Sequence, residues 1–339
     1  MELQRAASLQ PYNTFGIDAK ATLLAEFTSK EELQELLQHP QVKALPKLIL
    51  GGGSNVLFTQ DVEAAVLLNR IKGITQAPQE DQEHVLVTAG SGETWHDLVL
   101  YTIEQGLGGI ENLSLIPGTV GAAPLQNIGA YGVELKDTFY SLEAVEMETG
   151  QTITFGKEEC NFGYRESIFK KEAKGRYIVT SVTLQLTRNP TFNTSYGAIS
   201  NTLEEMQVKE LSLKAISDAV IHIRRTKLPD PAKIGNAGSF FKNPEIGLAQ
   251  FDILKEQYPT MPGYPVSEHT VKVPAGWLIE QCGWKGKVLG KHGVHKDQAL
   301  VLVNYGGATG NEVKALAYEI IKSVEEKFGI SLSPEVNII

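Results

Sequence analysis

The chain has 339 residues and a mass of 37.0 kDa, which is too long for one small hydrophobic core and predicts two or three domains. Apolar residues make up 42% and charged residues 21%, so disorder, collagen and coiled coil are excluded as descriptions of the whole chain. With 31 Lys and Arg against 40 Asp and Glu, the net charge of −9 argues against general nucleic-acid binding.

Membrane and secretory segments are not expected. The longest apolar runs, such as residues 64–68 and 299–303, fall far short of the roughly 18 residues of a membrane helix. Residues 1–16 hold no apolar stretch typical of a signal peptide. Because Cys160 and Cys282 lie far apart and form no CxxC pair, a disulfide framework and a four-thiolate metal site are excluded. We expect a cytoplasmic protein without a metal.

Short helices and strands are both predicted in the first third of the chain. Ser29 and Glu32 have the spacing of a capping box, which predicts a helix over 29–38. Residues 47–50 are a predicted buried strand that leads into three glycines. A further strand is expected over 85–89, followed by a helix over about 94–105 that Gly106 can cap.

Periodicity is clearest in three later segments. Apolar residues at every second position predict a strand over 177–186. Helical spacing predicts a helix over 213–223, ended by Pro229 and Pro231, and a last helix over 313–328, ended by Gly329. Because helices and strands mix without regular βαβ alternation, we predict an α+β fold rather than a doubly wound sheet. Domain boundaries are expected near residue 70 and near 228–231, where two prolines stiffen the chain.

A cationic stretch lies between residues 224 and 243. It holds Arg224, Arg225, Lys227, Lys233 and Lys242 against the single anion Asp230, a local charge of +4 in an acidic protein. An anionic ligand is one interpretation, and a solvated helix end followed by a loop is the other.

Two glycine-rich segments favour a phosphate-bearing or flat ligand. In LILGGGSNVLF (48–58), a strand runs into three glycines, so backbone N–H groups can turn toward an anion, although a tight structural turn remains the alternative. The segment is neither a Walker A loop nor a G-x-G-x-x-G fingerprint. In IPGTVGAAPLQNIGAYG (116–132), prolines and glycines are expected to prevent a regular helix or strand, and Gln126 and Asn127 are candidate donors.

Two further segments carry reactive side chains. FGYRESIFK (162–170) holds Tyr164 and Arg165, and Arg165 alone would be interpreted as a surface ion-pair residue. GNAGSFFKNP (235–244) sets Ser239 in a position where a serine is ordinarily a turn residue. His292 and His295 form an HxxH pair without a carboxylate pattern, which favours packing over metal binding.

Together these segments resemble the UDP-N-acetylenolpyruvoylglucosamine reductase family of bacterial cell-wall synthesis. The resemblance begins at NTFGIDA (13–19), covers nearly the whole chain and ends at SPEVNII (333–339), with the motifs in the same order and separation. In NTSYGAIS (193–200), Tyr196 resembles the substrate-loop tyrosine of the subtype that carries an extra loop.

The resemblance implies an FAD-binding fold of the vanillyl-alcohol oxidase type and a C-terminal substrate-binding domain. It implies non-covalent FAD, NADPH as co-substrate, and reduction of the enolpyruvyl ether of UDP-N-acetylglucosamine to the lactyl ether of UDP-N-acetylmuramate. The partner is then a small-molecule UDP-sugar, and we expect a monomer that binds neither nucleic acid nor a membrane. The implied division is residues 1–70 with 328–339 as FAD-binding subdomain 1, 71–228 as subdomain 2, and 229–327 as the substrate domain.

The resemblance also implies the site residues. Ser239 matches the general acid, Glu335 the acid of the C-terminal motif, and Arg165 the cationic catalytic residue. Substrate contacts match Tyr164, Tyr196, Lys227 and Asn243, with Tyr196 and Lys227 near the diphosphate. The implied cofactor contacts come from the two glycine-rich segments: Gly51, Gly52, Gly53, Ser54, Asn55, Pro117, Gly118, Thr119, Gly121, Gln126, Asn127, Ile128, Gly129, Ala130, Tyr131 and Gly132.

In the implied reaction, hydride from the flavin adds to the terminal enol carbon and Ser239 delivers a proton to the adjacent carbon. Arg165 stabilises the enolate-like charge, an effect commonly worth about 3 kcal/mol per donor. Glu335 orients or polarises the substrate carboxylate in a protonated or hydrogen-bonded form, because an ionised glutamate would repel it. Ala122 and Ala123 depart from the serines of some members, which removes two possible hydroxyl bonds to the flavin.

Two other functions compete with this interpretation. An FAD-dependent oxidase of the same fold could use the glycine-rich segments, but it has no reason to keep Ser239, Lys227, Arg165 and Glu335 together. A non-catalytic nucleotide-binding protein could retain the fold only, and it would not be a yellow protein that bleaches with NADPH.

Overall fold

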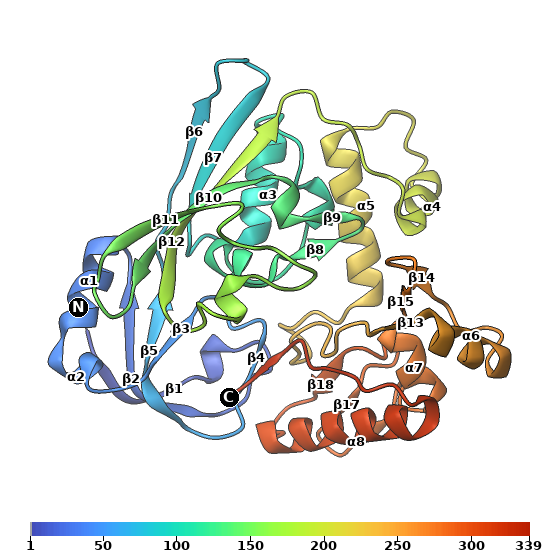
Figure 1. Cartoon of the computed structure of the whole chain (residues 1–339). Coiled ribbons are helices and arrows are strands. Elements are labelled where there is room, and N and C mark those ends of the chain that lie inside the picture. Colours follow the sequence, from blue (N-terminus) through green and yellow to red (C-terminus); the bar gives the residue numbers. More distant parts are fainter. Residues whose placement is uncertain (1) are drawn as a thin grey trace. The chain divides into compact units, whose positions relative to one another are not determined.

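The computed structural model describes residues 2–339, which divide into two compact units (Figure 1). The first unit holds the N-terminal residues to Ala7, Ala21–Gly52 and Glu63–Thr226. The second holds Ser8–Lys20, Gly53–Val62 and Lys227–Ile339. The three-part division expected from the sequence stays a prediction.

A four-stranded sheet forms one layer of the first unit. Its order is β1 (Gln4–Ser8), β2 (Lys20–Phe27), β5 (Val62–Asn69) and β3 (Lys47–Leu50), and β3 runs parallel to β5. Helices α1 (Lys30–Gln38) and α2 (Pro40–Lys43) cover it. The core between them consists of buried apolar side chains: Leu23, Phe27, Leu33, Leu36, Val42, Ala65 and Leu67.

The N-terminus of α1 differs from the expected capping box. Ser29 accepts the backbone N–H of Glu32 as predicted, at 3.1 Å. The Glu32 carboxylate, however, accepts from the backbone N–H and the hydroxyl of Thr28, at 2.7 and 2.8 Å. The reciprocal bond to Ser29 was a wrong prediction, because Thr28 offers the carboxylate two donors one residue earlier.

An antiparallel five-stranded sheet forms the larger layer of the first unit. Its order is β11 (Thr152–Gly156), β10 (Phe139–Glu146), β12 (Tyr177–Thr187), β7 (His84–Gly90) and β6 (Ile74–Pro78). Helix α3 (Trp95–Glu104) lies against it (Figure 1) and ends before Gly106, which has a positive φ of 70°. The core includes Cys160, and burial raises the pKa of its thiol to about 12, so this thiol is not a nucleophile.

Two helices complete the first unit. Helices α4 (Gly197–Glu205) and α5 (Leu213–Lys227) share a small apolar core, against which Tyr131 and Phe192 also pack. Helix α5 ends two residues before Pro229, as the sequence predicts. The shared core consists of Ile199, Leu203, Ile216, Ala219, Val220 and Ile223.

The second unit combines short strands with three helices. Strands β13 (Glu245–Gly247), β15 (Thr270–Lys272) and β14 (Tyr264–Pro265) form one sheet, and β16 (Val288–Leu289), β17 (His292–Val294) and β18 (Leu302–Asn304) form another. Strand β19 (Asn337–Ile338) pairs parallel with β4 (Val56–Leu57). Helices α6 (Leu248–Gln257), α7 (Ala275–Gln281) and α8 (Gly310–Phe328) complete the unit, and α8 is capped by Thr309 and Gly329.

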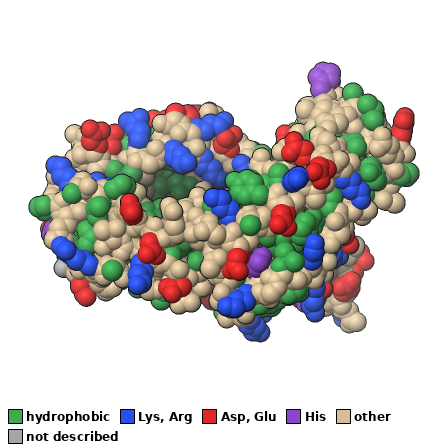
Figure 2. Space-filling view, turned by 90° about the horizontal axis from the view of Figure 1, so that it is seen from below, with side chains coloured by type: hydrophobic (Ala, Val, Ile, Leu, Met, Phe, Trp, Pro, Cys, Tyr) green, Lys and Arg blue, Asp and Glu red, His purple; other side chains and the backbone are tan. Residues whose placement is uncertain are grey.

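This mixed content confirms the α+β prediction. Acidic and basic side chains are interspersed on the face drawn in Figure 2. Over residues 2–339, none of the helices has the length and apolar character needed to cross a membrane.

Candidate functional site

The two glycine-rich segments meet inside the first unit. Gly51 and Gly52 follow β3, and a Cβ added to Gly52 would lie 3.1 Å from the Cα of Gly118. A Cβ on Gly51 would lie 2.3 Å from the hydroxyl oxygen of Thr119. The two backbones therefore form one continuous surface that has no room for side chains at their junction, and Gly52 and Pro117 are exposed.

The segment that carries Gly118 is fastened beside the start of α3. The backbone N–H of Trp95 donates to the Gly118 carbonyl at 3.0 Å. In return, Val120 donates to the carbonyl of Glu93, and Gly121 to that of Ser91, each at 2.9 Å. These bonds fix the backbone over residues 118–121, so that a ligand would meet a preformed surface.

Residue Leu115, just before this segment, is held in a left-handed conformation from two sides. Its φ is 59°, and its N–H donates to Nδ1 of His96 at 2.9 Å. Its carbonyl accepts from Nε of Arg224 in α5 at 3.2 Å. Burial lowers the pKa of His96, and the charge of Asp97 opposes this shift. The lowered pKa favours the neutral ring, whose Nδ1 accepts this bond.

Residues 116–132 are more regular than the sequence predicted. Gly129–Ala130 form β8, which pairs with β9 (Val133–Glu134), and short 3-10 turns cover Val120–Ala122 and Pro124–Gln126. The expectation of no regular strand was therefore wrong for β8. Its partner β9 lies outside the glycine-rich segment, and the pairing depends on the turn between the two strands.

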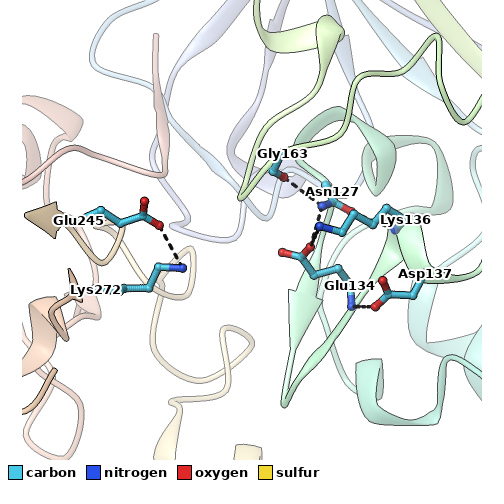
Figure 3. A network of polar contacts seen from close by, with 7 residues as sticks. All are labelled: Asn127, Glu134, Lys136, Asp137, Gly163, Glu245 and Lys272. Carbon is cyan, nitrogen blue, oxygen red and sulfur yellow. Dashed lines mark hydrogen bonds and ion pairs between the residues drawn. The ribbon is translucent and has the colours of Figure 1, made fainter. Parts of the chain in front are cut away.

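Asn127 supports this hairpin with its side chain (Figure 3). Its Nδ2 donates to the carbonyl of Gly163 at 3.0 Å and to the Glu134 carboxylate at 3.3 Å, while its Oδ1 accepts from the N–H of Lys136 at 3.0 Å. Lys136 also forms a 2.6 Å ion pair with Glu134. Because the amide is used within the chain, the expected cofactor contact of Asn127 rests on its backbone.

Arg165 lies at the tip of a tight turn against the hairpin. Gly163 and Glu166, which flank Tyr164 and Arg165, pair through reciprocal backbone bonds of 3.0 and 3.3 Å, and Arg165 has a φ of 54°. A Cβ on Gly129 would lie 3.5 Å from Nη1 of Arg165. Burial lowers the pKa of the nearby Arg224, and the charge of Arg165 adds to this effect. The positive charges of Arg165 and Arg224 thus act on each other, and such a pair of charges favours binding of an anion.

An aromatic pair completes the candidate site of the first unit. The rings of Tyr131 and Tyr196 pack edge to face, with centroids 5.4 Å apart and an interplanar angle of 86°. Burial raises the pKa of the Tyr131 phenol, and Arg224 opposes this shift. Tyr196 is 51% exposed, so one side of its ring is open to a ligand.

In the second unit the segment of Ser239 lies against the segment of Glu335. Ser239 forms an isolated β-bridge with Val301. The carbonyl of Phe240, the residue after Ser239, accepts a 2.8 Å hydrogen bond from the N–H of Glu335. The carbonyl of Glu335 accepts from the side chain of Asn55 at 3.4 Å. Four segments, at residues 55, 239–240, 301 and 335, thus meet at the two predicted catalytic residues.

Two predicted substrate residues occupy different settings. Oδ1 of Asn243 accepts the N–H of Ala275 at 2.9 Å, so this amide oxygen caps α7. Lys227 is the last residue of α5 and is exposed. Near Asn243 in sequence, Glu245 and Lys272 form a 3.2 Å ion pair across β13 and β15 (Figure 3).

Several residues of the site had no assigned role in the sequence analysis. His96 and Asn112 gave no pattern, and Arg224 was noted only as part of the cationic stretch. Their main partners are backbone carbonyl or N–H groups, which no motif reveals. Among residues 2–339, no cluster of three or more His, Cys, Asp or Glu could hold a metal ion.

Comparison with known proteins gives relatives along the whole chain. The FAD binding domain family matches residues 21–156, and the family described as UDP-N-acetylenolpyruvoylglucosamine reductase, C-terminal domain, matches residues 230–339. The UDP-N-acetylenolpyruvoylglucosamine reductase of Flavobacterium johnsoniae is 54% identical over 100% of both chains. That of Pseudomonas putida is 48% identical over 100% of this chain and 99% of its own.

Solved structures agree on the fold. The UDP-N-acetylenolpyruvylglucosamine reductase from Thermus caldophilus matches with a TM-score of 0.68 and 24% identity, over 100% of this chain and 99% of its own. The 6-hydroxy-D-nicotine oxidase from Arthrobacter nicotinovorans matches with a TM-score of 0.52 and 14% identity, over 97% and 86%. The predicted FAD-binding fold of the vanillyl-alcohol oxidase type with a C-terminal domain is confirmed.

Proposed function

This chain belongs to the UDP-N-acetylenolpyruvoylglucosamine reductase family, and we propose that it carries out the reaction with NADPH as the electron donor and Ser239 as the proton donor. It is an FAD-dependent oxidoreductase of peptidoglycan precursor synthesis, and its substrate is UDP-N-acetylglucosamine enolpyruvate. The observation that carries the proposal is the hydrogen bond between Glu335 and Phe240, because it joins the segment of Glu335 to the residue that follows Ser239.

The residues of the first unit fit FAD. The junction of Gly52 with Gly118 offers bare backbone to a pyrophosphate or a flat ring, and the hydrogen bonds of residues 118–121 hold this surface in place. When bound, FAD supplies the hydride that reduces the enolpyruvyl group. In the first unit, the residues that would hold it are Gly51, Gly52 and the expected contacts within residues 117–132, with Asn127 acting through its backbone. The expected contacts Gly53, Ser54 and Asn55 belong to the second unit.

The side chains of this chain divide the remaining work. The Ser239 hydroxyl donates a proton to the substrate carbon that bears the carboxylate and the ether oxygen. Arg165 stabilises the negative charge that develops there, since a positively charged donor in a fixed position favours the transition state. Glu335, held through its backbone by Phe240 and Asn55, orients the substrate carboxylate.

Substrate binding is assigned to four other side chains. Lys227 and Tyr196 contact the diphosphate, since the first is an exposed cation and the second an exposed hydroxyl-bearing ring. Asn243 contacts the substrate through the part of its amide that does not cap α7. Tyr164, which is 38% exposed beside Arg165, adds a further contact.

We also propose that the protein is a monomer in the cytoplasm. Cys160 and Cys282 are free thiols, which fits a reducing compartment. Size-exclusion chromatography with light scattering measures the oligomeric state directly.

Anaerobic reduction tests the proposed function. The yellow holoprotein should bleach on addition of NADPH, and UDP-N-acetylglucosamine enolpyruvate should then restore the oxidised flavin spectrum and yield a product heavier by two hydrogen atoms. A flavin that NADPH bleaches but only oxygen reoxidises would instead support an oxidase. A protein that does not bleach would contradict the assignment of NADPH.

A further inference from the structure

We propose that Asn112 and Asn193 are positioning residues that hold the segment of Tyr196 against the β8–β9 hairpin. This inference rests on the proposed contact of Tyr196 with the substrate. It concerns how that contact is kept in place, and all of the residues involved belong to the first unit.

The turn of the hairpin is the fixed point. Tyr131 and Gly132 connect Ala130 to Val133, and their φ angles of 50° and 80° are both positive, the pattern of a type I′ turn. A tyrosine is strained in this region, so the turn needs support from outside the hairpin. Two asparagine amides supply it: Nδ2 of Asn112 donates to the Tyr131 carbonyl, and Nδ2 of Asn193 donates to the Gly132 carbonyl, each at 3.2 Å.

Asn112 joins the two segments directly. The same Nδ2 donates a second bond, of 2.9 Å, to the backbone carbonyl of Asn193. The residue is 1% exposed, and within residues 2–339 its buried Oδ1 has no hydrogen-bond partner. Because a buried acceptor without a partner is unfavourable, an asparagine here has to be explained by its two donated bonds.

Asn193 extends the connection toward Tyr196. Its Oδ1 accepts from the N–H and the hydroxyl of Ser195, at 3.2 and 2.7 Å, so one amide fixes both the hairpin and the residue before Tyr196. A Cβ on Gly132 would lie only 3.2 Å from Nδ2 of Asn193, so a larger residue at 132 would push the two segments apart. The edge-to-face contact of Tyr196 with Tyr131 is the result of this connection.

The variant Asn193→Asp tests the hydrogen bond to the hairpin at Gly132 separately from the bonds that Asn193 accepts from Ser195. The carboxylate keeps the acceptor for Ser195 but loses the donor to Gly132 and faces that carbonyl with a negative charge. Asn189→Asp is the matched control, since Asn189 is exposed in the same loop and takes the same chemical change. We expect Asn193→Asp to raise the KM for the enolpyruvyl substrate about fivefold to tenfold, with kcat within about twofold, and Asn189→Asp to change neither. Asn193→Asp should have no further effect in a Tyr196→Ala background.

Two measurements separate the inference from the proposed function. If Tyr196→Ala raises KM and Asn193→Asp does not, the positioning role is overturned. If Tyr196→Ala leaves KM unchanged, it is the substrate contact that fails. Hydrogen exchange of residues 194–198 then decides: faster exchange in Asn193→Asp than in Asn189→Asp supports the connection, and equal exchange overturns it.

Discussion

The backbone N–H of Glu335 donates a 2.8 Å hydrogen bond to the carbonyl oxygen of Phe240, the residue that follows Ser239. On the other side of the same segment, Ser239 forms a β-bridge with Val301. The N–H of Phe240 donates to the carbonyl of Leu300 at 2.8 Å. The Ser239 backbone is therefore fixed by two neighbouring segments. A side chain on such a support needs little reorganisation before it donates a proton.

Substitution of Lys227 tests the assignment of the diphosphate site. Lys227→Ala should raise the apparent KM for the UDP-sugar roughly tenfold or more, because a charge-assisted hydrogen bond contributes about 1.5–3 kcal/mol. Tyr196→Phe should act in the same direction with a smaller effect. Steady-state kinetics and the FAD content of the purified variants measure both, and the FAD content should not change.

Lys214→Ala is the control for this experiment. Lys214 lies exposed near the start of the same helix and pairs only with Asp218 among the described residues, at 2.6 Å. If Lys227→Ala and Lys214→Ala have the same substrate kinetics, the cationic stretch is a solvated helix end and not a binding feature.

Gly121→Ala tests the cofactor surface of the first unit. The added Cβ would lie 2.6 Å from the Cβ of Ser91 and 3.1 Å from its carbonyl oxygen, so the segment 118–121 must move away from its support. We expect a loss of about 1–3 kcal/mol in stability, as for overpacked cores, together with a lower FAD content. Thermal unfolding and the flavin absorbance per chain measure the two effects.

Gly247→Ala provides the comparison for Gly121→Ala. A Cβ on Gly247 meets no atom within 4 Å, so this variant should keep its FAD and most of its stability. Equal FAD content in the two alanine variants would show that the backbone of residues 118–121 does not hold the cofactor.

The protonation of His96 predicts a dependence of stability on pH. Its folded-state pKa is lowered, mainly by burial, below the value of 6.5 expected for the unfolded chain. The neutral ring therefore contributes stability that is complete above about pH 6.5 and is lost as the pH falls through the lower folded-state pKa. The melting temperature and FAD retention should fall in this acid range, because Leu115 loses the acceptor that precedes the cofactor segment.

His96→Asn isolates this effect. An asparagine Oδ1 can accept the Leu115 N–H but does not titrate, so the variant should lose less stability between about pH 7 and pH 5 than the unmodified protein. The same acid-induced loss in both proteins would assign the effect to other groups.

Elements with long apolar patterns could be predicted from the sequence. Helices α1, α3, α5 and α8 and strands β7 and β12 bury several side chains each, so their periodicity is visible in the chain. Strands β4 and β19 have two residues each and exist only because each pairs with the other. The paired residues, such as Asn337 and Val56, lie 281 positions apart in the sequence. The β8–β9 hairpin was missed because a tyrosine occupies a turn position where asparagine or glycine is usual.

Candidate site residues could be predicted from the sequence where they belong to a motif. Ser239, Arg165 and Glu335 belong to motifs that resemble a known family, and the structure shows how each is supported. Asn112, Asn193 and His96 act through backbone groups of residues that are distant in sequence. Such contacts follow from the packing of α3, α5 and the hairpin, which no single segment encodes.

Substitution of Ser239, the proposed proton donor, separates the two half-reactions at one side chain. Ser239→Ala should bind FAD and be reduced by NADPH at a near-normal rate, because flavin reduction needs no proton from the serine. Reoxidation by the enolpyruvyl substrate should slow by about 10²–10⁴-fold, the usual effect of losing a positioned general acid. Ser239→Cys, which keeps a donor proton, should recover part of the rate.

Stopped-flow absorbance of the flavin, recorded anaerobically for both half-reactions of Ser239→Ala, is the most direct measurement. We expect normal reduction and severely slowed reoxidation. If Ser239 only supports a turn, alanine should cost about 1 kcal/mol of stability and little catalysis. Equal slowing of both half-reactions, or slowing of neither, would contradict the assignment of Ser239 as the acid.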